Sequence, residues 1–130
     1  MGTCVGPQLG KEGPVFIHRY PASQAALARH DPDDARVALR FELYLRGVEL
    51  ANGFEELADG SEQRARFTAD QRSRAARNLS VPAMDDYLLA ALDAGLPPCS
   101  GVALGFDRLL MLACNAERID EVMAFTSERA

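Results

Sequence analysis

The chain has 130 residues and a formal net charge of −5 at pH 7; 48% of its residues are hydrophobic and 25% are charged. This length allows one domain with its own hydrophobic core. The acidic balance argues against unaided nucleic-acid binding, which a basic domain normally carries. Three cysteines without C-x-x-C spacing and two histidines argue against a disulfide framework and a structural zinc site. With no signal-peptide pattern and no apolar run of bilayer length, we expect a soluble, reducing, cytoplasmic setting.

The first half of the chain predicts an antiparallel sheet. Residues 14–21 form a short β-rich run between two prolines. A helical turn and a loop broken at Asp31-Pro32 follow. Residues 36–46 alternate between apolar and polar side chains, which is typical of a half-buried strand, and residues 48–54 are its return strand.

The second half predicts helices around one further strand. Residues 59–78 form a helix with Asp59 or Ser61 as its cap, and residues 83–95 form a second helix. A strand follows in residues 96–105, then an apolar helix that begins near Asp107, and a last short strand or extended segment at 119–125. The fold class is α+β, an antiparallel sheet flanked by helices. We expect the hairpin, the second helix and the apolar helix to share one core.

The hairpin carries an unusual number of carboxylates for a β structure. A two-residue turn at Arg46-Gly47 places Glu42, Tyr44 and Glu49 on one face. The opposite, core-facing side is predicted to hold the apolar residues Phe41, Leu43, Leu45, Val48 and Leu50.

Glu42 and Glu49 are diagonal neighbours across this hairpin, at roughly 7–8 Å. Two carboxylates at that spacing repel each other unless a cation lies between them. Mg²⁺ is a natural candidate, since it typically uses one or two carboxylates plus substrate phosphates. The alternative is a solvated face on which Arg36, Arg40 and Arg46 pair with the carboxylates.

The sequence "NGFEEL" suits a ligand site. Asn52 offers donors and an acceptor, Gly53 allows close approach, and Phe54 provides a flat apolar wall. Because side chains alternate along a strand, only one of Glu55 and Glu56 can join the active face.

Residues 100–112 combine a Gly-rich strand with a helix start. Gly101, Ala103 and Gly105 alternate and leave a flat platform on which a planar ring could lie. Arg108, beside the helix N-terminus, makes an anion site suited to phosphate. The alternative is a packed strand–helix corner in which Asp107 and Arg108 form an ordinary ion pair.

These segments resemble a known family. "GVALGFDRLLML" resembles motif 3 of the class II aminoacyl-tRNA synthetases, and "RFELYLRGVELANGFEEL" resembles the metal- and lysine-binding hairpin of the lysyl-tRNA synthetases. "PASQAALA", "GVELANGFEEL", "PPCSGVALGFDRLLMLA" and "AFTSERA" are similar to the elongation factor P lysyl-ligases, which are lysyl-tRNA synthetase paralogues. The resemblance runs from about Pro14 to Ala130 and places motif 3 at about 99–113. Motifs 1 and 2 are absent, so we interpret residues 1–130 as a C-terminal fragment of such a catalytic domain.

The resemblance implies a role for each matched position, with ATP and Mg as cofactors. The implied metal ligands are Glu42 and Glu49; the ATP-binding residues are Glu49, Leu50, Gly105 and Arg108, with Arg108 the catalytic candidate that grips the γ-phosphate; the lysine-binding residues are Asn52, Phe54, Glu56 and Ala103. Lysyl-tRNA synthetases typically have Gly where this chain has Ala103, and the added methyl narrows the site.

The implied reaction activates lysine or β-lysine as an adenylate and transfers it to a lysine of elongation factor P. The expected partners are ATP, lysine or β-lysine, and elongation factor P; tRNA and membranes are not expected, and the full-length protein would be a homodimer. Two alternatives stay open: a fragment of a lysyl-tRNA synthetase, and a non-catalytic remnant. The Arg-rich helix could likewise be a solvated face or a docking surface for an acidic protein.

Overall fold

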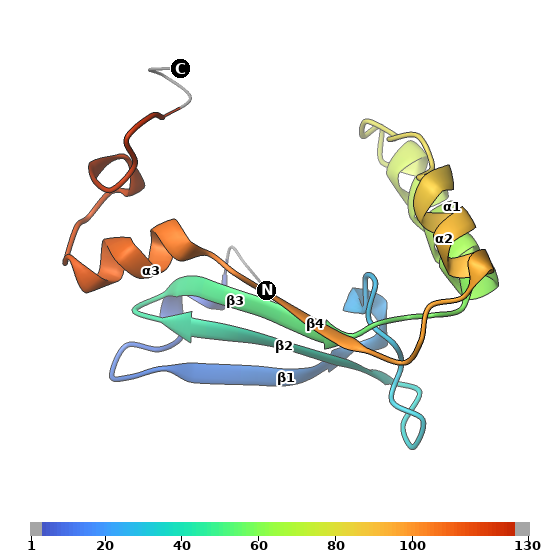
Figure 1. The fold of residues 1–130 in the computed structure, drawn as a ribbon, viewed down its shortest axis with the longest axis horizontal. Helices are drawn as coiled ribbons and strands as arrows, with labels where there is room; N and C mark the ends of the chain where they lie inside the picture. The colour runs from blue at the N-terminus through green and yellow to red at the C-terminus, as the bar shows by residue number, and fades with distance from the viewer. Residues whose placement is uncertain (1–3, 127–130) are drawn as a thin grey trace. The chain divides into compact units, whose positions relative to one another are not determined.

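The computed structural model describes residues 4–126 and divides the chain into two compact units (Figure 1). Unit one holds residues 1–18, 41–53 and 102–130, and unit two holds residues 19–40 and 54–101. The elements are η1 (Gly6–Gln8), β1 (Val15–Pro21), η2 (Ala22–Gln24), β2 (Val37–Leu45), β3 (Val48–Glu55), α1 (Gly60–Ala76), α2 (Asp86–Ala94), β4 (Ser100–Leu104), α3 (Phe106–Ala113) and η3 (Ile119–Glu121). The strands form a four-stranded antiparallel sheet in the order β1-β2-β3-β4, which confirms the predicted α+β class.

The β2–β3 turn has the predicted two-residue length. Arg46 and Gly47 have φ values of 52° and 78°, as a type I′ turn requires. The N–H groups of Arg46 and Gly47 donate to Gly10 O at 2.7 Å and Leu9 O at 2.8 Å. A Cβ atom at position 47 would lie 2.9 Å from Pro7 O. The segment before β1 is therefore held closely against the hairpin turn.

The predicted burial of the hairpin faces is confirmed at Leu50, which is 4% exposed, but is wrong on β2. Glu42 and Tyr44 are buried, with 5% and 3% of their surface exposed. The apolar residues that were predicted to face the core on β2 are only half-buried: Phe41, Leu43 and Leu45. The cause lies before β1, where Gly6 packs on Tyr44 so closely that a Cβ at position 6 would lie 3.2 Å from the Tyr44 ring.

Helix α3 contributes no buried residue within the described part of the chain. In unit two, Ala25, Ala28 and Ala38 form a buried cluster against which Phe54 packs. The helices α1 and α2 pack on each other, and α2 buries Leu89 and Leu92. None of the described helices combines the length and apolar character that crossing a bilayer requires.

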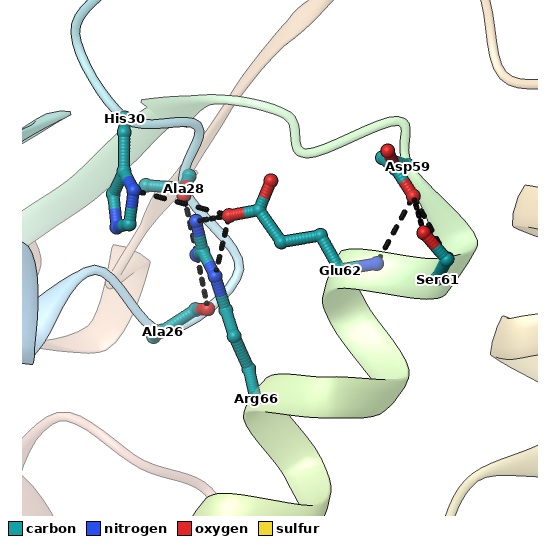
Figure 2. A network of polar contacts seen from close by, with 7 residues as sticks. All are labelled: Ala26, Ala28, His30, Asp59, Ser61, Glu62 and Arg66. Carbon is teal, nitrogen blue, oxygen red and sulfur yellow. Dashed lines mark hydrogen bonds and ion pairs between the residues drawn. The ribbon is translucent and has the colours of Figure 1, made fainter. Parts of the chain in front are cut away.

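Helix α1 begins where the sequence predicts, with Asp59 as its cap (Figure 2). The Asp59 carboxylate accepts bonds from Ser61 N at 2.8 Å, Ser61 Oγ at 2.7 Å and Glu62 N at 3.0 Å. These bonds, with that from the Ser61 hydroxyl as the largest cause, hold the pKa of Asp59 below its ordinary value. The carboxylate thus satisfies N–H groups that the first turn leaves without partners.

Arg66 ties α1 to the loop that precedes β2, as Figure 2 shows. Its guanidinium donates to Ala28 O at 2.7 Å and Ala26 O at 3.1 Å, and it pairs with Glu62 one turn earlier. His30 Nδ1 lies 3.8 Å from the same Glu62 carboxylate. This network positions the loop that carries part of the alanine cluster.

Two other element predictions need correction. Helix α2 begins at Asp86 rather than at residue 83, because the Asp85 carboxylate caps it by accepting from Leu88 N at 2.9 Å. The expected final strand is instead the 3-10 turn η3. Glu121 there accepts from Arg118 N at 2.8 Å, a local bond that closes the turn. The last residues of "AFTSERA", 127–130, lie outside the described residues.

Candidate functional site

The predicted ATP-binding residues lie together in unit one. Gly105 N, at the cap of α3, donates to Leu50 O at 2.8 Å. Arg108 Nη1 donates to Glu49 O at 3.0 Å. Two hydrogen bonds to the β3 backbone therefore fix the strand–helix corner of β4 and α3 on the hairpin.

Arg108 retains capacity for an anion. Its guanidinium has five N–H donors, and the one recorded bond, to Glu49 O, leaves other donors available. The side chain is exposed and lies in the first turn of α3, where backbone N–H groups and the helix dipole also favour negative charge. Within residues 4–126 no ion pair joins Asp107 to Arg108, contrary to the ordinary-pair alternative.

The two candidate metal ligands have different surroundings. The buried Glu42 carboxylate accepts the Tyr44 hydroxyl at 2.5 Å. The half-buried Glu49 carboxylate has no recorded hydrogen bond or ion pair within the described residues, while its backbone carbonyl holds Arg108. No cluster of three or more His, Cys, Asp or Glu occurs in the described part of the chain. Two carboxylates are a set that fits Mg²⁺ completed by water and substrate phosphates.

Glu55, the last residue of β3, and Glu56, which follows it, have different surroundings. Glu55 Oε1 accepts from Arg29 Nη1 at 2.6 Å. The half-buried Glu56 carboxylate has no recorded partner among residues 4–126. Its backbone is fixed, since Glu56 N donates to Cys99 O at 2.9 Å. Glu56 is therefore the carboxylate of this pair that is available to a cation.

The remaining predicted lysine-site residues divide between the units. Phe54, in unit two, packs against the alanine cluster, which restricts its ring. In unit one, Asn52 is half-buried on β3 and Ala103 is exposed on β4.

Sequence reasoning missed two features of the site. The Tyr44 hydroxyl is the partner of a candidate metal ligand, a contact that the i, i+2 spacing of Glu42 and Tyr44 on one strand could have suggested. Gly101 was interpreted only as part of a flat platform. A Cβ atom at position 101 would lie 3.0 Å from Glu56 Oε1. A glycine inside a strand is the signal that could have indicated this close approach.

Comparison with known proteins gives one family. A family model of the tRNA synthetases class II (D, K and N) matches residues 7–129. Proteins named "Elongation factor P--(R)-beta-lysine ligase" from Klebsiella pneumoniae and Edwardsiella ictaluri are 60% identical to the chain over 126 residues. One of the same name from Salmonella arizonae is 59% identical over 126 residues. These matches cover 97% of the chain, which spans 39% of the length of each of these relatives.

Proposed function

Because the chain belongs to the class II tRNA synthetases of the D, K and N group, we propose that it supplies ATP-, metal- and lysine-binding residues to a ligase that modifies elongation factor P. The substrate would be β-lysine or lysine, and the acceptor would be a lysine side chain of elongation factor P. The proposal is supported by the 60% identity to proteins named for this reaction. The observation that carries it is the bonding of Gly105 and Arg108 to Leu50 and Glu49, which joins motif 3 to the hairpin.

The proposed reaction has two steps. A carboxylate oxygen of the amino acid attacks the α-phosphorus of ATP, and pyrophosphate leaves. The acceptor amine then attacks the acyl carbon, AMP leaves, and the amine proton is lost to solvent. Neither step needs a covalent enzyme intermediate, so the protein contributes orientation and charge neutralisation.

The residues of unit one would bind the nucleotide. Arg108 would hold the γ-phosphate with the donors that Glu49 O does not use. Gly105 would support the adenine ring, and Leu50 would contact the nucleotide through its backbone. Glu42 and Glu49 would hold Mg²⁺, which neutralises phosphate charge when it is bound.

The amino acid would be recognised by its side-chain ammonium. The Glu56 carboxylate, which has no recorded partner within residues 4–126, would receive that ammonium. The family resemblance also assigns Phe54, Asn52 and Ala103 to amino-acid binding: Phe54 as an apolar contact, Asn52 as a polar contact, and Ala103 through its added methyl.

Mass spectrometry tests the proposal directly. The full-length protein, of which we interpret this chain as a part, is incubated with elongation factor P, ATP and Mg²⁺, and with either (R)-β-lysine or lysine. We expect the mass of elongation factor P to rise by one lysyl group, together with ATP–pyrophosphate exchange that requires the amino acid. Charging of lysine tRNA without modification of elongation factor P would contradict the proposal and favour a lysyl-tRNA synthetase.

A further inference from the structure

Gly101 occupies a strand position that its own backbone does not explain. Glycine inside a strand weakens it, since it adds conformational entropy and packs no side chain. Gly101 lies within β4, and its φ is outside the left-handed region, unlike that of Gly10, Gly47 and Gly95. Any L residue could therefore adopt this conformation, and the reason for glycine must lie in its surroundings.

Among the described residues, the atom that restricts a side chain at position 101 is a carboxylate oxygen of Glu56. Within 4 Å of a Cβ built at position 101, chain neighbours aside, the contact recorded is Glu56 Oε1 at 3.0 Å. Real Cβ contacts are rarely that short, so a methyl group there would displace the carboxylate. The bond from Glu56 N to Cys99 O fixes the two backbones relative to each other, so the adjustment falls on the Glu56 side chain.

Other glycines provide a comparison. A Cβ at Gly105 would lie 3.3 Å from Cδ of Arg108, the residue proposed to bind ATP. A Cβ at Gly13 would meet no heavy atom within 4 Å. The absence of a side chain at Gly101 thus leaves space for Glu56, and its absence at Gly105 leaves space for Arg108. At Gly13 no side chain of the described residues uses the space.

We propose that Gly101 is a positioning residue that sets where the Glu56 carboxylate lies, and so determines which amine-bearing side chain the enzyme accepts. This inference rests on the proposed function. An added methyl at 101 would move the carboxylate away from the place where the substrate ammonium binds. A misplacement of about 1 Å in an active site can cost up to about 100-fold, and the shift required here is a few tenths of an ångström, so the expected cost is smaller.

The test compares KM values in the native protein. We expect Gly101→Ala to raise the KM for the amino acid about two- to tenfold and to leave the KM for ATP unchanged. Gly105→Ala should instead affect ATP, through Arg108, and Gly13→Ala should affect neither substrate. The thermal midpoint of Gly101→Ala should match that of Gly13→Ala.

A second change separates positioning from a merely structural effect. Glu56→Asp shortens the side chain by one methylene and withdraws it from the added Cβ. The double variant Gly101→Ala/Glu56→Asp should therefore lose less than the product of the two single losses. Multiplicative losses, a parallel rise in the KM for ATP, or failure of Gly101→Ala to fold would each overturn the inference. Absence of amino-acid-dependent exchange in the unmodified full-length protein, of which we interpret this chain as a part, would overturn the proposed function itself.

Discussion

Tyr44 is the side chain that fixes one candidate metal ligand. Its hydroxyl donates to Glu42 Oε2 at 2.5 Å, and both residues are buried. A bond of that length to a carboxylate is typical of a charge-assisted contact. It restrains the carboxylate group, and with it the direction in which Glu42 would offer an oxygen to a metal.

We therefore expect Tyr44→Phe to weaken metal binding in the presence of ATP by about 10–100-fold, the usual cost of losing an outer-shell partner. The ring is retained, so packing against Gly6 should persist. Mn²⁺ titration followed by electron paramagnetic resonance measures the affinity without relying on turnover. Tyr87→Phe is the matched control, since Tyr87 is 93% exposed. Equal Mn²⁺ affinity in the Tyr44 and Tyr87 variants would exclude the role.

The same pair of carboxylates predicts how metal binding depends on nucleotide. Glu42 and Glu49 are too few ligands to hold Mg²⁺ without further oxygens from phosphates and water. We expect tight Mg²⁺ binding only when ATP is present. Titrations with and without nucleotide, followed by amide chemical shifts of Glu42 and Glu49, test this. Tight binding to the protein alone would contradict the assignment.

Glu56 and Glu55 form a natural mutant pair. A lost hydrogen bond to a charged group costs roughly 1.5–3 kcal/mol, or about 10–150-fold. Glu56→Gln should raise the KM for β-lysine or lysine by that factor and leave ATP affinity unchanged. Glu55→Gln should change neither KM, because Glu55 is engaged with Arg29 at 2.6 Å. If ATP affinity falls equally in Glu56→Gln, the ammonium role is wrong.

At the scale of elements, the Asp59 cap makes the stability of α1 depend on pH. The folded pKa of Asp59 is lowered, chiefly by the Ser61 hydroxyl. A lowered folded pKa adds stability above the unfolded value, and this stability is lost as the pH falls through the folded value. Asparagine caps helices about as well as aspartate but does not titrate.

We therefore expect Asp59→Asn to melt close to the unmodified chain in acid and below it at neutral pH. Asp59→Ala should melt lower than both at neutral pH, because it removes the cap acceptor as well. Circular dichroism melts across pH 2–7, a range of about five units around carboxyl titration, provide the measurement. A constant gap between the unmodified chain and the Asp59→Asn variant over this range would show that the cap charge is not linked to folding.

The arginines of α1 divide into structural and solvated ones. Arg66 bonds to the loop carbonyls, Arg74 Nε donates to Ser80 O at 2.7 Å, and Arg64 lies 3.6 Å from Asp93. Arg72 and Arg77 are exposed, and no side-chain partner is recorded for them within residues 4–126.

Arg72 and Arg77 are therefore the residues with which to test a docking surface. We expect these two arginines to be solvated and to bind no protein partner. Reversing both charges to Glu should change the rate of elongation factor P modification by less than about twofold, as surface substitutions usually do. The rate is compared at low and high salt. A severalfold loss confined to low salt would instead indicate docking of an acidic partner.

Local chemistry explains what the sequence could predict in these elements. The two-residue turn at Arg46-Gly47 and the Asp59 cap each depend on near neighbours, and each is confirmed. The buried side of β2 was not predictable from its periodicity. It depends on Gly6 reaching Tyr44 from a segment 38 residues earlier in the chain. The separation of Gly101 and Glu56 in sequence hid their contact in the same way.

At the scale of the whole molecule, the surface of β4 and α3 is unusually apolar. Val102, Leu104 and Phe106 are 65%, 51% and 68% exposed, and β4 is an edge strand of the sheet. An exposed apolar edge strand readily pairs with other chains. We expect the 130-residue chain to self-associate with rising concentration in sedimentation velocity. Val102→Lys/Leu104→Lys should restore a single slow species; an unchanged distribution would place the contact elsewhere.

The last prediction concerns catalysis by these 130 residues alone. Attack at the α-phosphorus needs a positive clamp on that phosphate, and losing one such stabiliser typically costs about 10²–10³ in rate. The family resemblance assigns that clamp, and the groups that hold the attacking carboxylate, to motif 2, which we expect to lie outside these 130 residues. Arg108, the cation assigned to ATP here, is matched to the γ-phosphate, which lies two phosphates along the chain from the reacting α-phosphorus. Orientation of two reactants is worth up to about 7–11 kcal/mol of barrier, and residues for one side of a pocket do not supply it.

We therefore expect the chain by itself to show no pyrophosphate exchange with lysine or β-lysine, although a nucleotide analogue can still perturb the amide signals of Leu50 and Gly105. Exchange at a rate close to that of the full-length protein would mean that the hairpin and motif 3 suffice for activation, and that the role assigned to motif 2 is wrong.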